Sequence, residues 1–149
     1  MQAIILAGGL GTRLKSVLGS EVPKPMAPVC GRPFLDWLLE YMASQGVTQA
    51  VLCVHYQARL IMAHYGAYYA GIRLHYSRET TPLGTGGAIR QAMRVLNAEW
   101  PVVVVNGDSL VEMSYRAMTA HHLLYGRSVT LATSRVMDCS RYSKLTVED

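Results

Sequence analysis

LAGGLGTRLKSVLGSEVPKP, at residues 6–25, joins an apolar run to a segment rich in glycine and basic side chains. The apolar run ends at three closely spaced glycines: Gly8, Gly9 and Gly11. Glycine tolerates positive φ and lets backbone N–H groups approach an anion closely. Arg13 adds a planar fork of donors, and Lys24 adds a point charge. The stretch therefore predicts a phosphate-binding loop after a buried strand.

Two familiar glycine motifs nearly fit this loop. A dinucleotide-binding GxGxxG motif that starts at Gly9 needs a third glycine where Leu14 stands. The P-loop pattern GxxxxGK[ST] fits residues 9–16 except at that same position. Because this glycine permits the close approach of the backbone to phosphate, we discount both motifs.

Composition bounds the class of protein. With 149 residues and 50% hydrophobic content, the chain can form one domain with a real core. No stretch approaches the roughly 20 apolar residues of a membrane span, and the N-terminus lacks the regions of a signal peptide. The three cysteines form no CxxC pair, and the net charge of +4 includes no basic run. We therefore expect a cytoplasmic protein that binds a small anionic substrate and neither nucleic acid nor membrane.

Hydrophobic periodicity predicts alternating strands and helices. The expected strands are residues 2–6, 50–54, 71–76, 101–105 and 128–134, with another starting at 141–147. The expected helices are residues 34–45, 57–65, 88–96 and 115–124. This βαβαβαβαβ order indicates an α/β protein with a doubly wound, mostly parallel, Rossmann-like sheet. Ligands bind beyond the carboxyl ends of the strands in such sheets.

Three features are expected at that edge: the glycine loop, the turn TTPLGTGG at residues 80–87, and Asn106–Gly107–Asp108. The structural interpretation of Asp108, which follows a predicted buried strand, is that it caps the next helix. We interpret Glu112 as a solvated carboxylate. His55 follows the second strand, and we favour a structural role for it over a contact with substrate.

The motifs together resemble the signature of the sugar-phosphate nucleotidylyltransferases. LAGGLGTRL followed by PKP, then PLGTGGA at residues 82–88 and NGD at 106–108, stand in that family's order and at its spacing. GLGTRLKSV, VPKPMAPVCGRPFL and YSRETTPLGTGGAIR look most like the D-glycero-D-manno-heptose 1-phosphate guanylyltransferases. The resemblance implies a glycosyltransferase-A-type nucleotidyltransferase fold. It also implies transfer of a nucleoside monophosphate, with GMP from GTP favoured, to a sugar 1-phosphate with release of pyrophosphate.

The same resemblance implies roles for single residues. The implied nucleotide-binding set is Leu6, Ala7, Gly8, Gly9, Gly11, Thr12, Arg13, Lys24, Glu79, Gly84, Thr85, Asn106 and Gly107. The implied catalytic residues are Arg13, Lys24 and Asp108, with Asp108 as the ligand of Mg²⁺, a hard cation that prefers oxygen. A carboxylate at Glu79 can accept from both N1–H and the exocyclic amine of guanine, the alternative being an ordinary exposed glutamate at a strand end.

Members of the family continue well past the point where this sequence stops. The missing part normally supplies a second metal-binding aspartate, a lysine for the sugar phosphate and strands that close the sugar pocket. We therefore expect residues 1–149 to be a nucleotide-binding core, truncated at the C-terminus and lacking part of the sugar-binding region.

Three alternatives stay open. In the first, the chain is a catalytically impaired nucleotide-binding or regulatory module. In the second, it is a nucleotidyltransferase specific for a different base. In the third, it uses another sugar, such as mannose 1-phosphate or N-acetylmuramate 1-phosphate. A homo-oligomer is also left open, because Tyr65, Tyr68 and Tyr69 offer aromatic surface for a subunit contact as well as for core packing.

Overall fold

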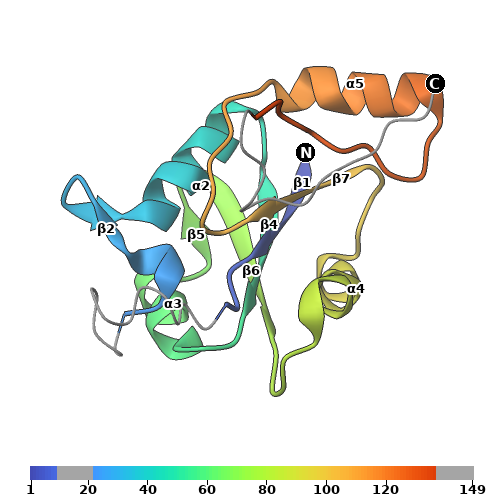
Figure 1. Cartoon of the computed structure of the whole chain (residues 1–149). Coiled ribbons are helices and arrows are strands. Elements are labelled where there is room, and N and C mark those ends of the chain that lie inside the picture. The colour runs from blue at the N-terminus through green and yellow to red at the C-terminus, as the bar shows by residue number, and fades with distance from the viewer. Residues whose placement is uncertain (10–21, 137–149) are drawn as a thin grey trace.

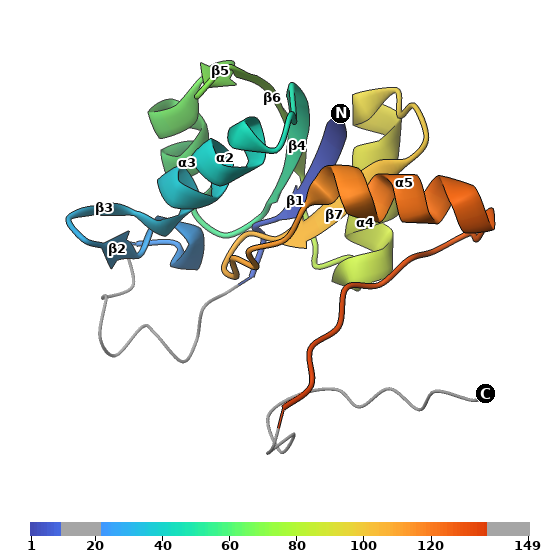
Figure 2. The ribbon, with the colours of Figure 1, turned by 90° about the horizontal axis from the view of Figure 1, so that it is seen from above.

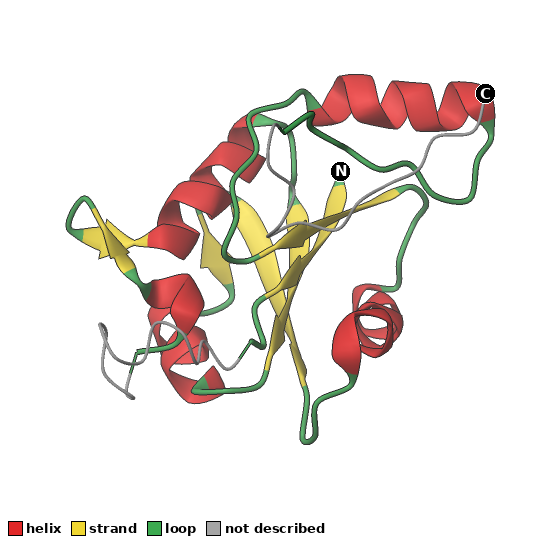
Figure 3. Ribbon diagram, viewed as in Figure 1, coloured by secondary structure: helices red, strands yellow, loops and turns green. Residues whose placement is uncertain are grey.

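The computed structural model describes residues 1–9 and 22–136. A five-stranded sheet forms its centre, and Figures 1 and 3 show how the helices surround it. The strand order is β5-β6-β4-β1-β7. The strands are β1 (Gln2–Leu6), β4 (Gln49–Val54), β5 (Tyr68–Tyr69), β6 (Ile72–Arg78) and β7 (Val102–Asn106). All neighbours pair in parallel except β5, which runs antiparallel to β6. The predicted doubly wound, mostly parallel sheet is confirmed.

Helices cover both faces of the sheet, as Figures 1 and 2 show: α2 (Phe34–Ser44) and α3 (Ala58–Tyr65) lie on one face, and α4 (Gly84–Leu96) lies on the other. A short helix η1 (Lys24–Met26) and a hairpin of β2 (Pro28–Val29) and β3 (Arg32–Pro33) precede α2. The helix α5 (Tyr115–Tyr125) follows β7. No helix within residues 1–9 and 22–136 has the length and apolar character needed to cross a membrane.

The apolar run at the N-terminus becomes the central strand β1 because both of its faces are covered. Ile5 packs in the larger apolar cluster with residues of α2 and α3, whereas its neighbour Ile4 packs in the smaller cluster with residues of α4. The chain adds β4 and then β6 on one side of β1, and α4 carries it back to place β7 on the other side. The order therefore reverses between β1 and β7, which is where sheets of this kind bind ligands.

Two predicted elements differ from the structure. Residues 128–134 were expected to form a strand and do not. Val129 and Leu131 are 70% and 64% exposed, and no strand among the described residues pairs with this segment. Alternating apolar residues favour a strand only where a neighbour supplies hydrogen bonds and packing, so the prediction was wrong. The predicted strand at residues 141–147 lies outside the described residues.

The third predicted helix begins four residues earlier than expected. Gly84, Thr85 and the two glycines after them form the first turn of α4, not a separate turn before it. Gly84 has a φ of +68°, which glycine adopts without the steric cost that a side chain would bring. The glycine-rich stretch therefore presents the N-terminal end of a helix.

Asp36 on α2 is a buried carboxylate that ties two helices together. It is 6% exposed, and the hydroxyl of Tyr65 on α3 donates to it over 2.7 Å. Arg32 and His64 also lie within ion-pair distance of it. Burial, and secondarily the bond to Asp36, raises the pKa of Tyr65, so this hydroxyl stays a donor. Tyr65 is thus a core residue, while Tyr68 is 61% exposed.

We predict that Tyr65→Phe lowers the free energy of unfolding by about 1.5–3 kcal/mol, because a buried carboxylate loses a hydrogen-bond donor. Tyr76→Phe is the matched control. It removes a bond from a hydroxyl to the exposed carbonyl of Gly66 and is expected to cost about 1 kcal/mol or less. Urea unfolding of both variants measures the difference, and equal losses would show that the Asp36 bond contributes nothing special.

Candidate functional site

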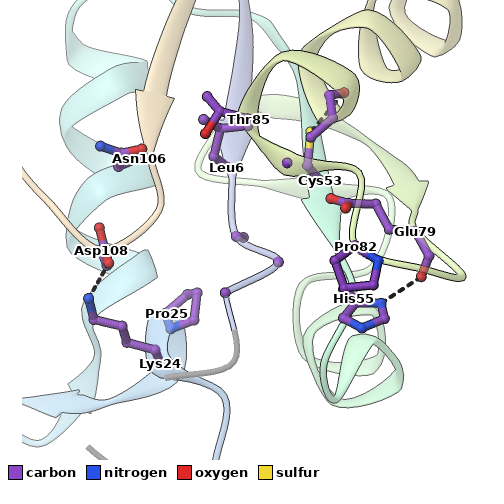
Figure 4. A pocket seen from close by; sticks show the side chains of 15 residues that line it. Leu6, Lys24, Pro25, Cys53, His55, Glu79, Pro82, Thr85, Asn106 and Asp108 are labelled. Carbon is purple, nitrogen blue, oxygen red and sulfur yellow. Dashed lines mark hydrogen bonds and ion pairs between the residues drawn. The ribbon is translucent and has the colours of Figure 1, made fainter. Parts of the chain in front are cut away.

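A cavity of about 450 Å³ opens beyond the carboxyl ends of the parallel strands (Figure 4). It brings together segments that lie about a hundred residues apart in the chain. Its lining residues are Leu6, Ala7, Gly8, Gly9, Lys24, Pro25, Cys53, His55, Glu79, Pro82, Gly84, Thr85, Ala88, Asn106 and Asp108. The cavity therefore lies where the topology predicts a ligand site.

Most of the site residues predicted from sequence line this one cavity. Gly107 lies between two lining residues, and Gly11, Thr12 and Arg13 lie outside the described residues. Sequence reasoning did not place Pro25, Cys53, Pro82 and Ala88 in the site, and it gave His55 a structural role. One signal was available for His55, since it directly follows β4 and so stands at the same edge as Gly8 and Asp108.

The ends of β1 and β7 approach each other very closely. The N–H of Gly107 donates to the carbonyl oxygen of Leu6 over 2.8 Å. A Cβ on Gly107 would lie 3.1 Å from that same oxygen and 3.2 Å from Cβ of Ala7. The absence of a side chain at Gly107 thus lets the first loop and the Asn106–Asp108 segment share one cavity.

Lys24 and Asp108 form a close ion pair at one end of the cavity (Figure 4). The second carboxylate oxygen of Asp108 accepts from the hydroxyl of Ser109 over 3.1 Å. The Lys24 and Asp108 side chains are 38% and 32% exposed, and ion pairs of such exposure contribute only about 0–1 kcal/mol. This ion pair therefore contributes little to stability, and another charged group can take the place of either partner.

The helix-cap alternative for Asp108 is excluded. Ser114 caps α5, because its hydroxyl accepts from the N–H of Ala117 over 3.1 Å. Glu112, between the two, is exposed as predicted. Asp108 is left facing the cavity with its carboxylate oxygens.

Glu79 lies at the opposite end of the cavity from the ion pair (Figure 4). It is only 8% exposed, so the alternative of an ordinary exposed glutamate is wrong. Its Oε2 accepts from the N–H of Leu83 over 3.0 Å, at the N-cap position of α4. A carboxylate there satisfies a free donor of the helix and interacts favourably with the positive end of its dipole.

Cys53 is a packing residue in this site. Burial, with a contribution from the charge of Glu79, raises the pKa of its thiol to about 12. The thiol is therefore neutral near pH 7, and its Sγ lies 3.7 Å from the carbonyl oxygen of Ala88 on α4. A neutral buried thiol is a poor nucleophile, so Cys53 acts here through its packing against α4.

The family model described as nucleotidyl transferase matches residues 2–148. The chain belongs to the nucleotidyl transferase family. It is 43% identical over all 149 residues to D-glycero-alpha-D-manno-heptose 1-phosphate guanylyltransferase of Aneurinibacillus thermoaerophilus, and covers 64% of that protein. It is 35% identical over 145 residues to mannose-1-phosphate guanyltransferase of Eremothecium gossypii, with 95% of this chain and 40% of that protein aligned.

Among solved structures, the chain matches HddC from Yersinia pseudotuberculosis complexed with GMP-PN. The TM-score is 0.73 at 41% identity, over 82% of this chain and 54% of that one. The chain thus spans less than two thirds of the length of each of these three proteins.

We predict that Gly107→Ala lowers the free energy of unfolding by about 1–3 kcal/mol, because the added methyl group meets atoms of Leu6 and Ala7 that have little room to move. Gly9→Ala is the matched control. Among the described residues no atom lies within 4 Å of a Cβ at Gly9, so its stability should change by less than about 1 kcal/mol. Thermal unfolding of the two variants measures the difference, and a tolerated Gly107→Ala would contradict the close approach.

Proposed function

We propose that this chain forms the nucleotide-binding core of a guanylyltransferase, which transfers GMP from GTP to a sugar 1-phosphate and releases pyrophosphate. The observation that carries the proposal is the convergence in one cavity of Gly8, Lys24, Glu79 and Asp108, in a member of the nucleotidyl transferase family. A heptose 1-phosphate is the favoured acceptor, because the heptose enzyme described above is more similar to this chain than the mannose enzyme.

The two ends of the cavity suit the two ends of a nucleotide. The buried carboxylate of Glu79 offers two acceptor oxygens, which match the N1–H and the exocyclic amine of guanine. Uracil does not present this pair of donors. Lys24 offers a cation at the other end, where the α-phosphate would lie. A nucleotide bound in this orientation would have its base against α4 and its phosphates beside β7.

Nucleotidyl transfer needs little covalent help from the protein. Catalysis of such reactions rests on positioning and on neutralising charge that develops on phosphate oxygens. Lys24 would position and neutralise the α-phosphate, and Arg13 is proposed to do the same for the rest of the triphosphate. The phosphate of the sugar would act as nucleophile, and pyrophosphate would leave.

The donor set at Asp108 fits Mg²⁺. This ion takes oxygen ligands, and in nucleotide sites it is commonly held by one or two carboxylates together with phosphate oxygens and water. Asp108 offers such a carboxylate, and Asn106 offers an amide oxygen in the same cavity. Within the described residues no group of three metal-binding side chains exists, so Asp108 would hold the ion jointly with the triphosphate. When bound, Mg²⁺ would neutralise charge on the phosphate oxygens.

The enzyme proposal predicts that the chain releases pyrophosphate from GTP when a heptose 1-phosphate is present. Pyrophosphate is measured continuously, and mannose 1-phosphate and N-acetylmuramate 1-phosphate are tested as alternative acceptors. Calorimetric titration with GTP runs beside this assay. Retained GTP binding without release from any pair would favour a nucleotide-binding or regulatory module. Loss of GTP binding as well would contradict both functions.

For the metal, we predict that Asp108→Asn weakens Mn²⁺ binding to the GTP complex at least tenfold, because a neutral amide replaces the carboxylate ligand. Mn²⁺ is measured by electron paramagnetic resonance, which does not depend on turnover. Glu112→Gln removes a neighbouring exposed carboxylate that does not line the cavity, and it should leave Mn²⁺ binding unchanged. Equal effects of the two substitutions would remove Asp108 from the metal site.

A further inference from the structure

His55 directly follows β4 and lines the cavity beside Glu79 (Figure 4). Its Nδ1 lies 2.8 Å from the carbonyl oxygen of Glu79. Because a carbonyl oxygen only accepts hydrogen bonds, Nδ1 must carry the hydrogen and donate it. The imidazole ring is thereby committed to one tautomer when neutral.

This bond completes a set of three that fixes Glu79. The backbone N–H of Glu79 donates to the carbonyl of Val54 over 2.9 Å, which continues the β4–β6 ladder by one step. The backbone carbonyl of Glu79 accepts a hydrogen bond from Nδ1–H of His55. The side-chain Oε2 of Glu79 accepts one from the N–H of Leu83. Both the backbone and one carboxylate oxygen are thus held.

The remaining carboxylate oxygen lies against the first glycine loop. A Cβ on Gly8 would be 3.2 Å from Oε1 of Glu79 and 3.4 Å from Cβ of His55. Gly8, His55 and Glu79 therefore form one tightly packed corner of the cavity. With 8% of its surface exposed, Glu79 has little freedom to adopt another position.

We propose that His55 is a positioning residue for base recognition: its Nδ1–H holds the Glu79 backbone so that the carboxylate meets both donors of guanine. This inference rests on the proposed function. The ladder between β4 and β6 ends at Val54 and Arg78, and the chain then turns away toward α4. Without a donor from His55, the carbonyl of Glu79 loses the hydrogen bond that holds it to the end of β4 at this turn, and the paired contact with guanine loses its alignment.

The sharpest probe is the ratio of the affinities for GTP and ITP. Hypoxanthine keeps N1–H and lacks the exocyclic amine, so this ratio isolates the second contact of a carboxylate with guanine. One hydrogen bond to a charged group corresponds to a factor of about ten. Calorimetric titration of the whole 149-residue chain with each nucleotide gives the ratio without any turnover.

His55→Leu removes the donor while keeping a side chain of similar width, and we expect it to lower the GTP to ITP ratio from about ten to below about three. His55→Asn places an amide N–H at the position of Nδ1, and we expect it to restore most of the ratio. A merely structural histidine would lower both affinities together and leave the ratio unchanged. Thermal unfolding of each variant checks that the fold persists.

Glu79→Gln separates this proposal from the proposed function. It keeps an oxygen for the N–H of Leu83 and loses one acceptor for guanine, so the ratio should fall. If Glu79→Gln lowers the ratio and His55→Leu does not, the role of His55 is overturned while base recognition by Glu79 stands. If Glu79→Gln leaves the ratio unchanged, base recognition by Glu79 fails, and the inference on His55 fails with it.

A measurement on the unsubstituted chain covers the case in which His55→Leu does not fold. In ¹⁵N-labelled protein, the Nδ1–H of His55 should be protected from exchange with water, and its resonance should persist at neutral pH. Protonation at Nε2 alone would overturn the hydrogen bond to Glu79, and with it the proposal.

Discussion

The close approach of β1 to β7 is the constraint on which the site depends. β1 pairs in parallel with both β4 and β7, so three strands end at one edge and deliver their following loops to the same place. Gly107 permits the close approach of the segments that follow β1 and β7, since its N–H donates to the carbonyl of Leu6 and no side chain separates the two segments. A wider separation would place Asp108 away from Gly8 and divide the cavity in two.

Much of this arrangement was predictable from the sequence. Short apolar runs such as residues 101–105 predict parallel strands, and the glycine and Asp108 motifs mark the edge at which those strands end. The burial expected for 101–105 was wrong, because β7 lies at the end of the strand order and Val104 is 42% exposed. The segment 128–134 was mispredicted because a strand depends on a partner, and periodicity carries no information about partners. The two-residue strand β5 was not anticipated, since two residues show no alternation.

Contacts between distant residues were the part that sequence could not supply. Glu79 looks like any polar residue after a strand, and its burial arises from contacts made in the fold, with the N–H of Leu83 on one side and Gly8 on the other. The pairing of Lys24 with Asp108 joins positions 84 residues apart. Each motif indicated a chemistry, while the distances between the motifs come from the packing of helices on the sheet.

Both carboxylates of the cavity already have an internal partner, and this matters for a site that is proposed to take a polyanion. Lys24 compensates Asp108, and the N–H of Leu83 with the helix dipole of α4 compensates Glu79. The two pairings differ in strength, because the first is partly exposed and the second is buried. The Lys24–Asp108 end of the cavity can therefore exchange its partners at little cost in free energy, whereas the Glu79 end stays rigid. A nucleotide bound as proposed would therefore meet a fixed carboxylate at its base and exchangeable charges at its phosphates.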